Sequence, residues 1–121
     1  MELLKASDFK LLSNPGVLSE QLLSPHNSAS ERITITRVTL EPGAAQPTHA
    51  HPKSEQVWVA LQGTGTLLLA DGQRTEFKQG GVVRFAEGDL HGLYNSGSEP
   101  FVYLSVTSPP IDFAYAYRRE T

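Results

Sequence analysis

Short runs of alternating apolar and polar residues dominate the chain, and they predict β-strands. The clearest run is Arg32–Leu40, which reads Arg-Ile-Thr-Ile-Thr-Arg-Val-Thr-Leu and is dense in β-branched residues. Such residues favour strands, and a period of two is typical of a strand with one buried face. Weaker versions of the pattern predict further strands over residues 17–23, 56–61, 64–70, 73–77, 82–85, 92–95 and 101–107.

Turn-forming residues separate these runs and argue against long helices. Ten glycines and eight prolines are spread along the chain. Few windows longer than about ten residues keep a helical period. Asp71-Gly72 is the sequence of a two-residue hairpin turn between neighbouring strands. Turns spaced by about eight to twelve residues, with no helix between them, indicate an all-β antiparallel sandwich or barrel.

Composition adds limits on partners and location. The 121 residues have the length of one domain, with 39% hydrophobic and 19% charged residues. A net charge of −3 gives no electrostatic reason to expect nucleic acid or an anionic membrane as a partner. The lack of cysteine excludes disulfides and cysteine-type zinc sites. No apolar run approaches the ~20 residues of a membrane span, and the start lacks the basic segment of a secretory signal, so we expect cytoplasmic residence.

Three histidines predict a metal site. His49 and His51 are two positions apart, so in an extended chain both imidazoles leave the same face, and His91 arrives from a later segment. A single histidine here is more simply explained as a polar residue at a barrel mouth, but three favour a bound ion. Nitrogen and oxygen ligands suit one divalent transition metal (Mn, Fe, Ni, Co, Cu or Zn), and the sequence does not choose among them.

The segments around these histidines resemble the two paired motifs of the cupin superfamily. The positions that fit are Gly43, His49, His51 and Gly63 in the first motif, and Gly80, Gly88, His91 and Asn95 in the second. Ala86 stands where the second motif usually has proline. The resemblance implies one domain over residues 1–121, an antiparallel double-stranded β-helix or jelly roll with the metal in its open end. The barrel would cover about residues 30–108, with an N-terminal strand segment over 1–24 and a tail over 109–121.

The fourth ligand of the family, usually glutamate, has two candidates here. Glu55 leaves three residues after His51 and seven before Gly63, whereas Gln56 leaves four and six, which satisfies both of the family's spacings. Side chains alternate along a strand, so only one of the two can face the metal. We favour Gln56, which would put Trp58 and Ala60 on the inner face as well. Three imidazoles and an amide would leave the ion's charge uncompensated and make it a stronger Lewis acid.

Several other residues have two interpretations. Trp58 is either barrel core or a wall of the substrate pocket. Arg37 and Arg84 are expected to face solvent, with Arg37 the candidate to test as an inward anchor for a carboxylate. Tyr94 and Tyr103 are candidate proton donors or pocket walls, and equally core residues. Asn95 is expected to support a turn, and His26 to be solvated.

The resemblance implies a metal-dependent enzyme acting on a small oxygen-rich substrate. The ligand set resembles that of small cupins that convert unsaturated sugar acids to linear keto acids, and it differs little from that of cupin dioxygenases. The alternative is a non-catalytic cupin that binds or senses a small molecule. A third option is a sugar-nucleotide epimerase, although those cupins usually work without a metal.

We also expect a homodimer, since cupins of this size usually pair. The N-terminal stretch is rich in apolar residues that an isolated barrel has no obvious place to bury. These residues are Leu3, Leu4, Phe9, Leu11 and Leu12. The tail alternates aromatics at Phe113, Tyr115 and Tyr117, and would lie across the barrel or against a partner chain.

Overall fold

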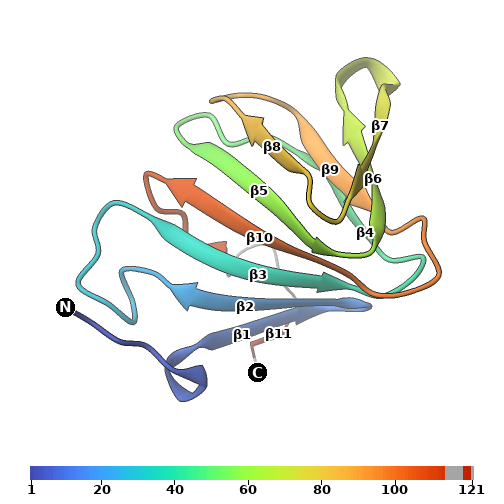
Figure 1. Cartoon of the computed structure of the whole chain (residues 1–121). Helices are drawn as coiled ribbons and strands as arrows, with labels where there is room; N and C mark the ends of the chain where they lie inside the picture. The colour runs from blue at the N-terminus through green and yellow to red at the C-terminus, as the bar shows by residue number, and fades with distance from the viewer. Residues whose placement is uncertain (114–118, 121) are drawn as a thin grey trace.

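The computed structural model describes residues 1–113 and 119–120, and it is all-β, with two antiparallel sheets (Figure 1). The larger sheet has seven strands in the order β11-β1-β2-β3-β10-β5-β8. Its strands are β1 (Lys10–Asn14), β2 (Val17–Leu23), β3 (Thr34–Leu40), β5 (Glu55–Gln62), β8 (Val82–Phe85), β10 (Phe101–Ser108) and β11 (Arg119–Glu120). The smaller sheet has the order β4-β9-β6-β7. Its strands are β4 (Ala45–His49), β6 (Thr64–Leu69), β7 (Arg74–Lys78) and β9 (His91–Tyr94).

The strands expected from the alternating pattern all form, with ends that move by one or two residues. Strand β2 spans Val17–Leu23 and β8 spans Val82–Phe85, as expected. The hairpin turn is confirmed at Asp71 and Gly72, which have φ of 60° and 71°. Positive φ at both central residues is the signature of the type I′ turn that suits a hairpin. Only two 3-10 turns, at Ala6–Asp8 and Ala70–Gly72, interrupt the strands of the described residues.

Inward positions of the strands form the core between the two sheets. In β5 the side chains of Gln56, Trp58 and Ala60 are buried, whereas Val57 and Val59 are only half-buried on the other face. This confirms the expected parity of the strand. The residues of this core cluster are Val17, Val38, Leu40, Trp58, Ala60, Leu67, Phe77, Phe85, Leu93, Phe101 and Tyr103.

Glycines and one asparagine fix the turns at the end of the barrel away from the histidines. Gly63 has a φ of 86°, and a Cβ there would lie 2.7 Å from the carbonyl oxygen of Pro100. Asn95 is 1% exposed, and its amide donates to the carbonyl oxygens of Leu40 and Glu99. The structural role expected for Asn95 is therefore confirmed.

The N-terminal stretch buries more of its apolar side chains than the sequence suggested. Leu12 lies in β1 and is 1% exposed, and Leu4, Phe9 and Leu11 are half-buried. Leu3 alone of the five expected interface residues is fully exposed, at 87%. The stretch therefore finds room within the fold, because β1 adds an extra strand to the larger sheet. None of the described residues forms a helix long and apolar enough to cross a membrane.

Candidate metal centre

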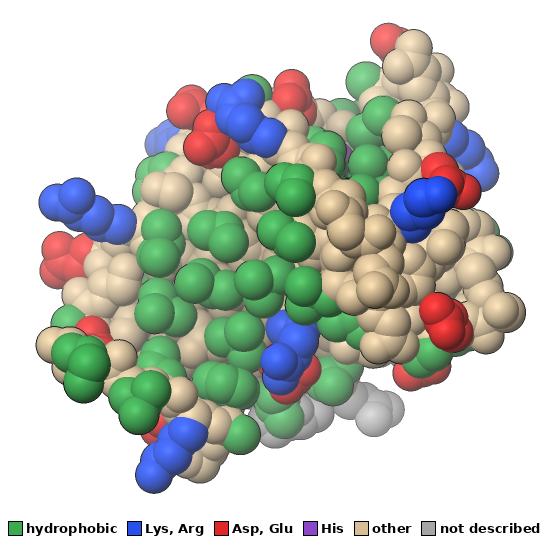
Figure 2. Space-filling view, in the orientation of Figure 1, with side chains coloured by type: hydrophobic (Ala, Val, Ile, Leu, Met, Phe, Trp, Pro, Cys, Tyr) green, Lys and Arg blue, Asp and Glu red, His purple; other side chains and the backbone are tan. Residues whose placement is uncertain are grey.

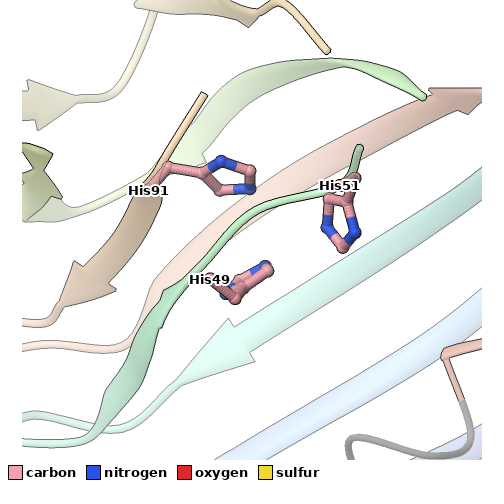
Figure 3. A group of neighbouring side chains, drawn as sticks. All are labelled: His49, His51 and His91. Atoms are coloured by element: carbon pink, nitrogen blue, oxygen red, sulfur yellow. The ribbon is translucent and has the colours of Figure 1, made fainter. Parts of the chain in front are cut away.

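The three histidines come together where the smaller sheet meets the opening of the barrel. His49 ends β4, His91 begins β9, and the two residues are partners in the pairing of these strands. His51 lies just beyond β4, and Figure 3 shows the three rings facing one another. One nitrogen from each ring lies within 4.8 Å of the others, and the ring centroids are 4.6–5.5 Å apart. The sequence predicted that these three histidines share one site, and the pairing of β4 with β9 brings His91 to the other two.

The backbone around His91 allows this close approach. Gly92 follows His91, and a Cβ at this position would lie 2.8 Å from the carbonyl oxygen of Gln46 and 2.9 Å from the amide nitrogen of Thr48. Strands β9 and β4 can therefore lie this close only with glycine at position 92. The turn before β9 is attached to the same segment, because the amide of Gly88 donates to the carbonyl oxygen of His51 at 2.9 Å.

Backbone carbonyls orient two of the rings. Nδ1 of His49 lies 2.9 Å from the carbonyl oxygen of Pro47, and Nδ1 of His91 lies 2.8 Å from that of Asp89. A carbonyl oxygen can only accept a hydrogen bond, so these contacts assign the proton to Nδ1 and leave the lone pair on Nε2. Nε2 of His51 is buried without a hydrogen-bond partner among the described residues. This is the tautomer arrangement that histidines use to hold a cation.

Gln56 lies with the histidines and Glu55 does not. Gln56 is 3% exposed; its Nε2 donates to Oγ1 of Thr107 at 2.9 Å, and its Oε1 lies 3.1 Å from Nε2 of His91. With the His91 proton on Nδ1, Nε2 of His91 and Oε1 of Gln56 are both hydrogen-bond acceptors. A cation bound beside these two atoms would stabilise this arrangement. Glu55 points to the outer face, where Nε of Arg84 donates to its carboxylate at 2.7 Å.

Burial keeps two of the imidazoles neutral. Loss of hydration on burial, together with a smaller effect of charge on His49, lowers the pKa of His51 to about 4. Burial likewise lowers the pKa of His91 to about 4, against a raising effect of its hydrogen bond to the Asp89 backbone. A neutral imidazole is the form that binds a metal ion.

A cavity of about 260 Å³ opens beside the histidines. His49, His51 and Gln56 line it at one side, with Trp58 and Tyr103 along its wall. Trp58 is therefore both core and pocket wall, since it is 2% exposed and its ring lies 5.3 Å from that of His91 and 4.4 Å from that of Tyr103. The hydroxyl of Tyr103 donates to Oε1 of Gln46 at 2.5 Å.

The tail contributes to the cavity through Phe113, whose ring lies 5.8 Å from that of His51. The carbonyl of Pro109 in the same segment accepts a hydrogen bond from the Ser54 hydroxyl at 2.9 Å. The first part of the tail thus packs against the barrel, which is one of the two expected positions. Tyr115 and Tyr117 are outside the described residues.

Three other residues with two interpretations lie outside the cavity, and Arg37 and Arg84 face outward as expected. Arg37 faces outward and pairs with Glu20 on the neighbouring strand at 2.9 Å, so the idea of an inward carboxylate anchor is wrong. Strand parity explains this, because Thr36 and Val38 occupy the inward positions on either side. The hydrogen bond from Arg37 also holds the pKa of Glu20 below its usual value. Arg84 pairs with Glu55 on the outer face of the larger sheet, and Tyr94 is exposed at the end of β9 in the smaller sheet.

The residues present fit a divalent transition metal. Their ligand atoms converge, one of them is buried without a partner, and the donor set is all nitrogen and amide oxygen. Such a set suits Mn, Fe, Ni, Co, Cu or Zn and offers no feature that selects one of them. It carries no negative charge, so a bound ion would attract an anionic or strongly polar oxygen into the cavity.

The chain belongs to the cupin family: the family described as Cupin domain matches residues 36–107, more than half of the chain. Members of this family bind small-molecule substrates or ligands. Auxin-binding protein ABP19b of Prunus persica is 32% identical over 92 residues, which cover 68% of this chain and 44% of that relative. The chain thus spans less than half the length of this relative.

Two solved structures share the fold over nearly the whole chain. KdgF from Halomonas sp. superposes with a TM-score of 0.78, covering 93% of this chain and 96% of its own, at 16% identity. The polyketide cyclase RemF from Streptomyces resistomycificus also gives a TM-score of 0.78, covering 91% of this chain and 80% of its own, at 21% identity. At these identities the likeness supports the cupin fold alone.

Proposed function

We propose that the protein binds one divalent transition-metal ion through His49, His51, Gln56 and His91 and uses it to act on a small oxygen-rich substrate. The observation that carries this is the convergence of three imidazole nitrogens within 4.8 Å at the edge of a 260 Å³ cavity. The orientation of the Nδ1 protons toward backbone carbonyls supports the same ligand set. One or two positions on the ion would stay open toward the cavity.

When bound, the ion would polarise a carbonyl or carboxylate oxygen of the substrate and stabilise an enediolate or oxyanion. The chain's own residues would orient the substrate and exclude water. Trp58 and Phe113 supply aromatic walls on either side of the opening. Tyr103 is the candidate for moving a proton, because its hydroxyl lines the cavity and no lysine, aspartate or glutamate does so among the described lining residues.

Within this class, we favour isomerisation or ring opening of a sugar acid or keto acid, with a dioxygenase reaction as the neighbouring possibility. Both use a metal-bound oxygen of the substrate, and both suit a neutral ligand set. RemF, one of the structural neighbours, is named as a cyclase. The second candidate is a non-catalytic binding protein, a function suggested by the name of the auxin-binding relative.

The decisive experiment measures metal and turnover on the same sample. Protein purified without an affinity tag is expected to contain about one divalent ion per chain by elemental analysis, and His51→Ala is expected to contain almost none. Full occupancy in His51→Ala would refute the ligand set. The loaded protein is then tested with uronates, keto acids and catechols while oxygen uptake is recorded. Turnover without oxygen uptake favours isomerisation or ring opening, turnover with uptake favours a dioxygenase, and saturable binding without turnover favours the binding protein.

A further inference from the structure

Buried hydroxyl groups without partners line the wall that the larger sheet gives to the cavity. Ser19 on β2, Thr36 on β3 and Ser105 on β10 are 1%, 3% and 5% exposed, and all three line the cavity. Their hydroxyl oxygens, and the indole nitrogen of Trp58, have no hydrogen-bond partner among the described residues. These four side chains are called the hydroxyl strip below.

Three members of the strip are cross-strand neighbours, whereas Ser19 lies opposite Val38 on β3. Thr36 pairs with Ser105 between β3 and β10, and Ser105 pairs with Trp58 between β10 and β5. A buried polar group without a partner destabilises a fold, so most are satisfied in native proteins. The next inward residue of β10, Thr107, shows the usual situation, because it accepts a hydrogen bond from Gln56. The four side chains of the strip line the cavity, so a ligand there would supply the missing hydrogen-bond partners.

Charge restricts what that ligand can be. No lysine, arginine, aspartate or glutamate is among the described residues that line the cavity. A second acidic group, far from the histidines, would lose its hydration without gaining an opposite charge. A hydroxyl group can donate to and accept from Ser and Thr, and it can accept from the indole of Trp58. The volume, about that of nine water molecules at ~30 Å³ each, suits a small ligand.

We propose that the hydroxyl strip binds the uncharged, hydroxylated part of a ligand whose single acidic group lies at the histidines. The ligand class is then a small polyhydroxy acid, as opposed to a dicarboxylate, a phosphate ester or an unsubstituted fatty acid. This assignment rests on the proposed function for the position of the acidic group. The binding of hydroxyl groups by the strip is inferred independently, from the unpaired polar groups and the uncharged lining of the cavity.

Calorimetric binding to protein loaded with Zn²⁺ tests the proposal with three six-carbon probes: gluconate, hexanoate and glucarate. Gluconate is expected to bind at least 10-fold more tightly than hexanoate, which lacks hydroxyls, and than glucarate, which carries a second carboxylate. In a Ser19→Ala, Thr36→Val, Ser105→Ala triple variant, gluconate should lose 10-fold or more in affinity while hexanoate loses none. Thr39→Val, on the outward face of β3, is the matched control and should leave all three affinities unchanged.

Equal affinity for gluconate in the wild type and the triple variant would overturn the proposal. Failure of the protein to take up zinc or any other of the candidate metals would instead overturn the proposed function, and the three probes would then be compared on metal-free protein. Thermal unfolding of metal-free Thr36→Val gives a further readout, which needs no ligand. Since Thr36 has no partner to lose, its melting temperature should stay equal or rise; a marked fall would show that the hydroxyl serves the fold and would count against the strip.

Discussion

Compared with a glutamate at the same position, Gln56 changes the charge of the candidate centre more than its shape. A glutamate in the same place would present an oxygen to His91 in a similar way, but would add a negative charge beside three neutral imidazoles. The amide instead hydrogen-bonds through its nitrogen to Thr107 and leaves its oxygen 3.1 Å from Nε2 of His91. Its orientation is thus fixed by the protein, which is what a weak neutral ligand needs.

The first prediction separates Gln56 from Glu55. Gln56→Ala removes one oxygen from the proposed ligand set and should weaken metal binding at least about 10-fold in a competition titration with a chelating dye. Gln56→Glu should bind at least as tightly as the wild type, because it adds a compensating charge. Glu55→Ala is the matched control on the outer face and should leave the metal content unchanged. Metal loss in Glu55→Ala with retention in Gln56→Ala would exclude this ligand assignment.

The second prediction concerns Tyr103. If its hydroxyl moves a proton, Tyr103→Phe should lower kcat about 100-fold or more on a substrate found by the screen. The same change should leave metal content and KM within a few fold, because the ring still fills its place beside Trp58. Loss of the hydrogen bond to Gln46 should cost about 1 kcal/mol of stability, measured by urea unfolding. An unchanged kcat would show that Tyr103 lines the cavity without taking part in proton transfer.

At the level of strands, the inward positions change character along the barrel. On β3 they run Thr34, Thr36, Val38, Leu40, polar at the end near the histidines and apolar at the other. On β10 they run in the opposite direction, from Phe101 and Tyr103 to Ser105 and Thr107. Antiparallel pairing places the two polar halves side by side, because Ser105 lies opposite Thr36. The larger sheet therefore builds an apolar half and a polar half from the same strands.

The change from polar to apolar inward residues can be predicted from the sequence, since it needs only the alternation of side chains along a strand. The contacts made by β4 could not be predicted in this way. Strand β4 escaped prediction because it contains Pro47 and only one β-branched residue, Thr48. It forms as an edge strand with an irregular register between Gln46 and His49, where proline is tolerated. The hydrogen bond between Gln46 and Tyr103 joins residues far apart in the chain, and no local pattern indicates it. The histidines were found because their spacing is local or belongs to a known motif.

The third prediction tests the contact between β4 and β9. A methyl group at Gly92 would meet backbone atoms of Gln46, Pro47 and Thr48 at 2.8–3.1 Å, and backbone cannot rotate aside. Gly92→Ala should therefore separate the two strands, lower stability by about 1–3 kcal/mol and weaken metal binding in the same titration.

Gly65→Ala is the control for general loss of stability, because its methyl group would first meet a side-chain atom of Leu93 at 3.1 Å, within the core. It should lower the melting temperature and keep the metal affinity. Equal loss of affinity in both variants would mean that the centre responds to overall stability alone, and not to the spacing of β4 and β9.

For the whole molecule, the most distinctive surface is the outer face of the larger sheet. Figure 2 shows hydrophobic side chains gathered over the middle of this face, with charged side chains mostly around them. The outward residues that form it are Leu18, Leu22, Ile35, Val57, Val59, Leu61, Val82, Val102, Leu104 and Val106. The charged residues at the outward positions of β2, β3, β5 and β8 are paired within the chain, Arg37 with Glu20 and Arg84 with Glu55. Such a face suits a second copy, because it is apolar and has no unpaired charge to oppose itself.

The last prediction is that the protein is a homodimer joined through this face, which would displace the N-terminal stretch as the main interface. A stable dimer buries about 800 Å² per partner, an area that a sheet face of this kind can supply.

Light scattering at micromolar concentration should give twice the chain mass for the wild type and the mass of one chain for Leu104→Glu, because the new carboxylate would lose its hydration at the centre of the interface. Leu3→Glu is the matched control at the exposed N-terminal leucine and should remain dimeric. If Leu3→Glu were monomeric and Leu104→Glu dimeric, the N-terminal stretch would be the interface. A monomeric wild type would exclude both interfaces. Retained metal binding in Leu104→Glu would show that its mass change reflects dissociation of folded chains, since the histidines lie inside the barrel and not on the outer face.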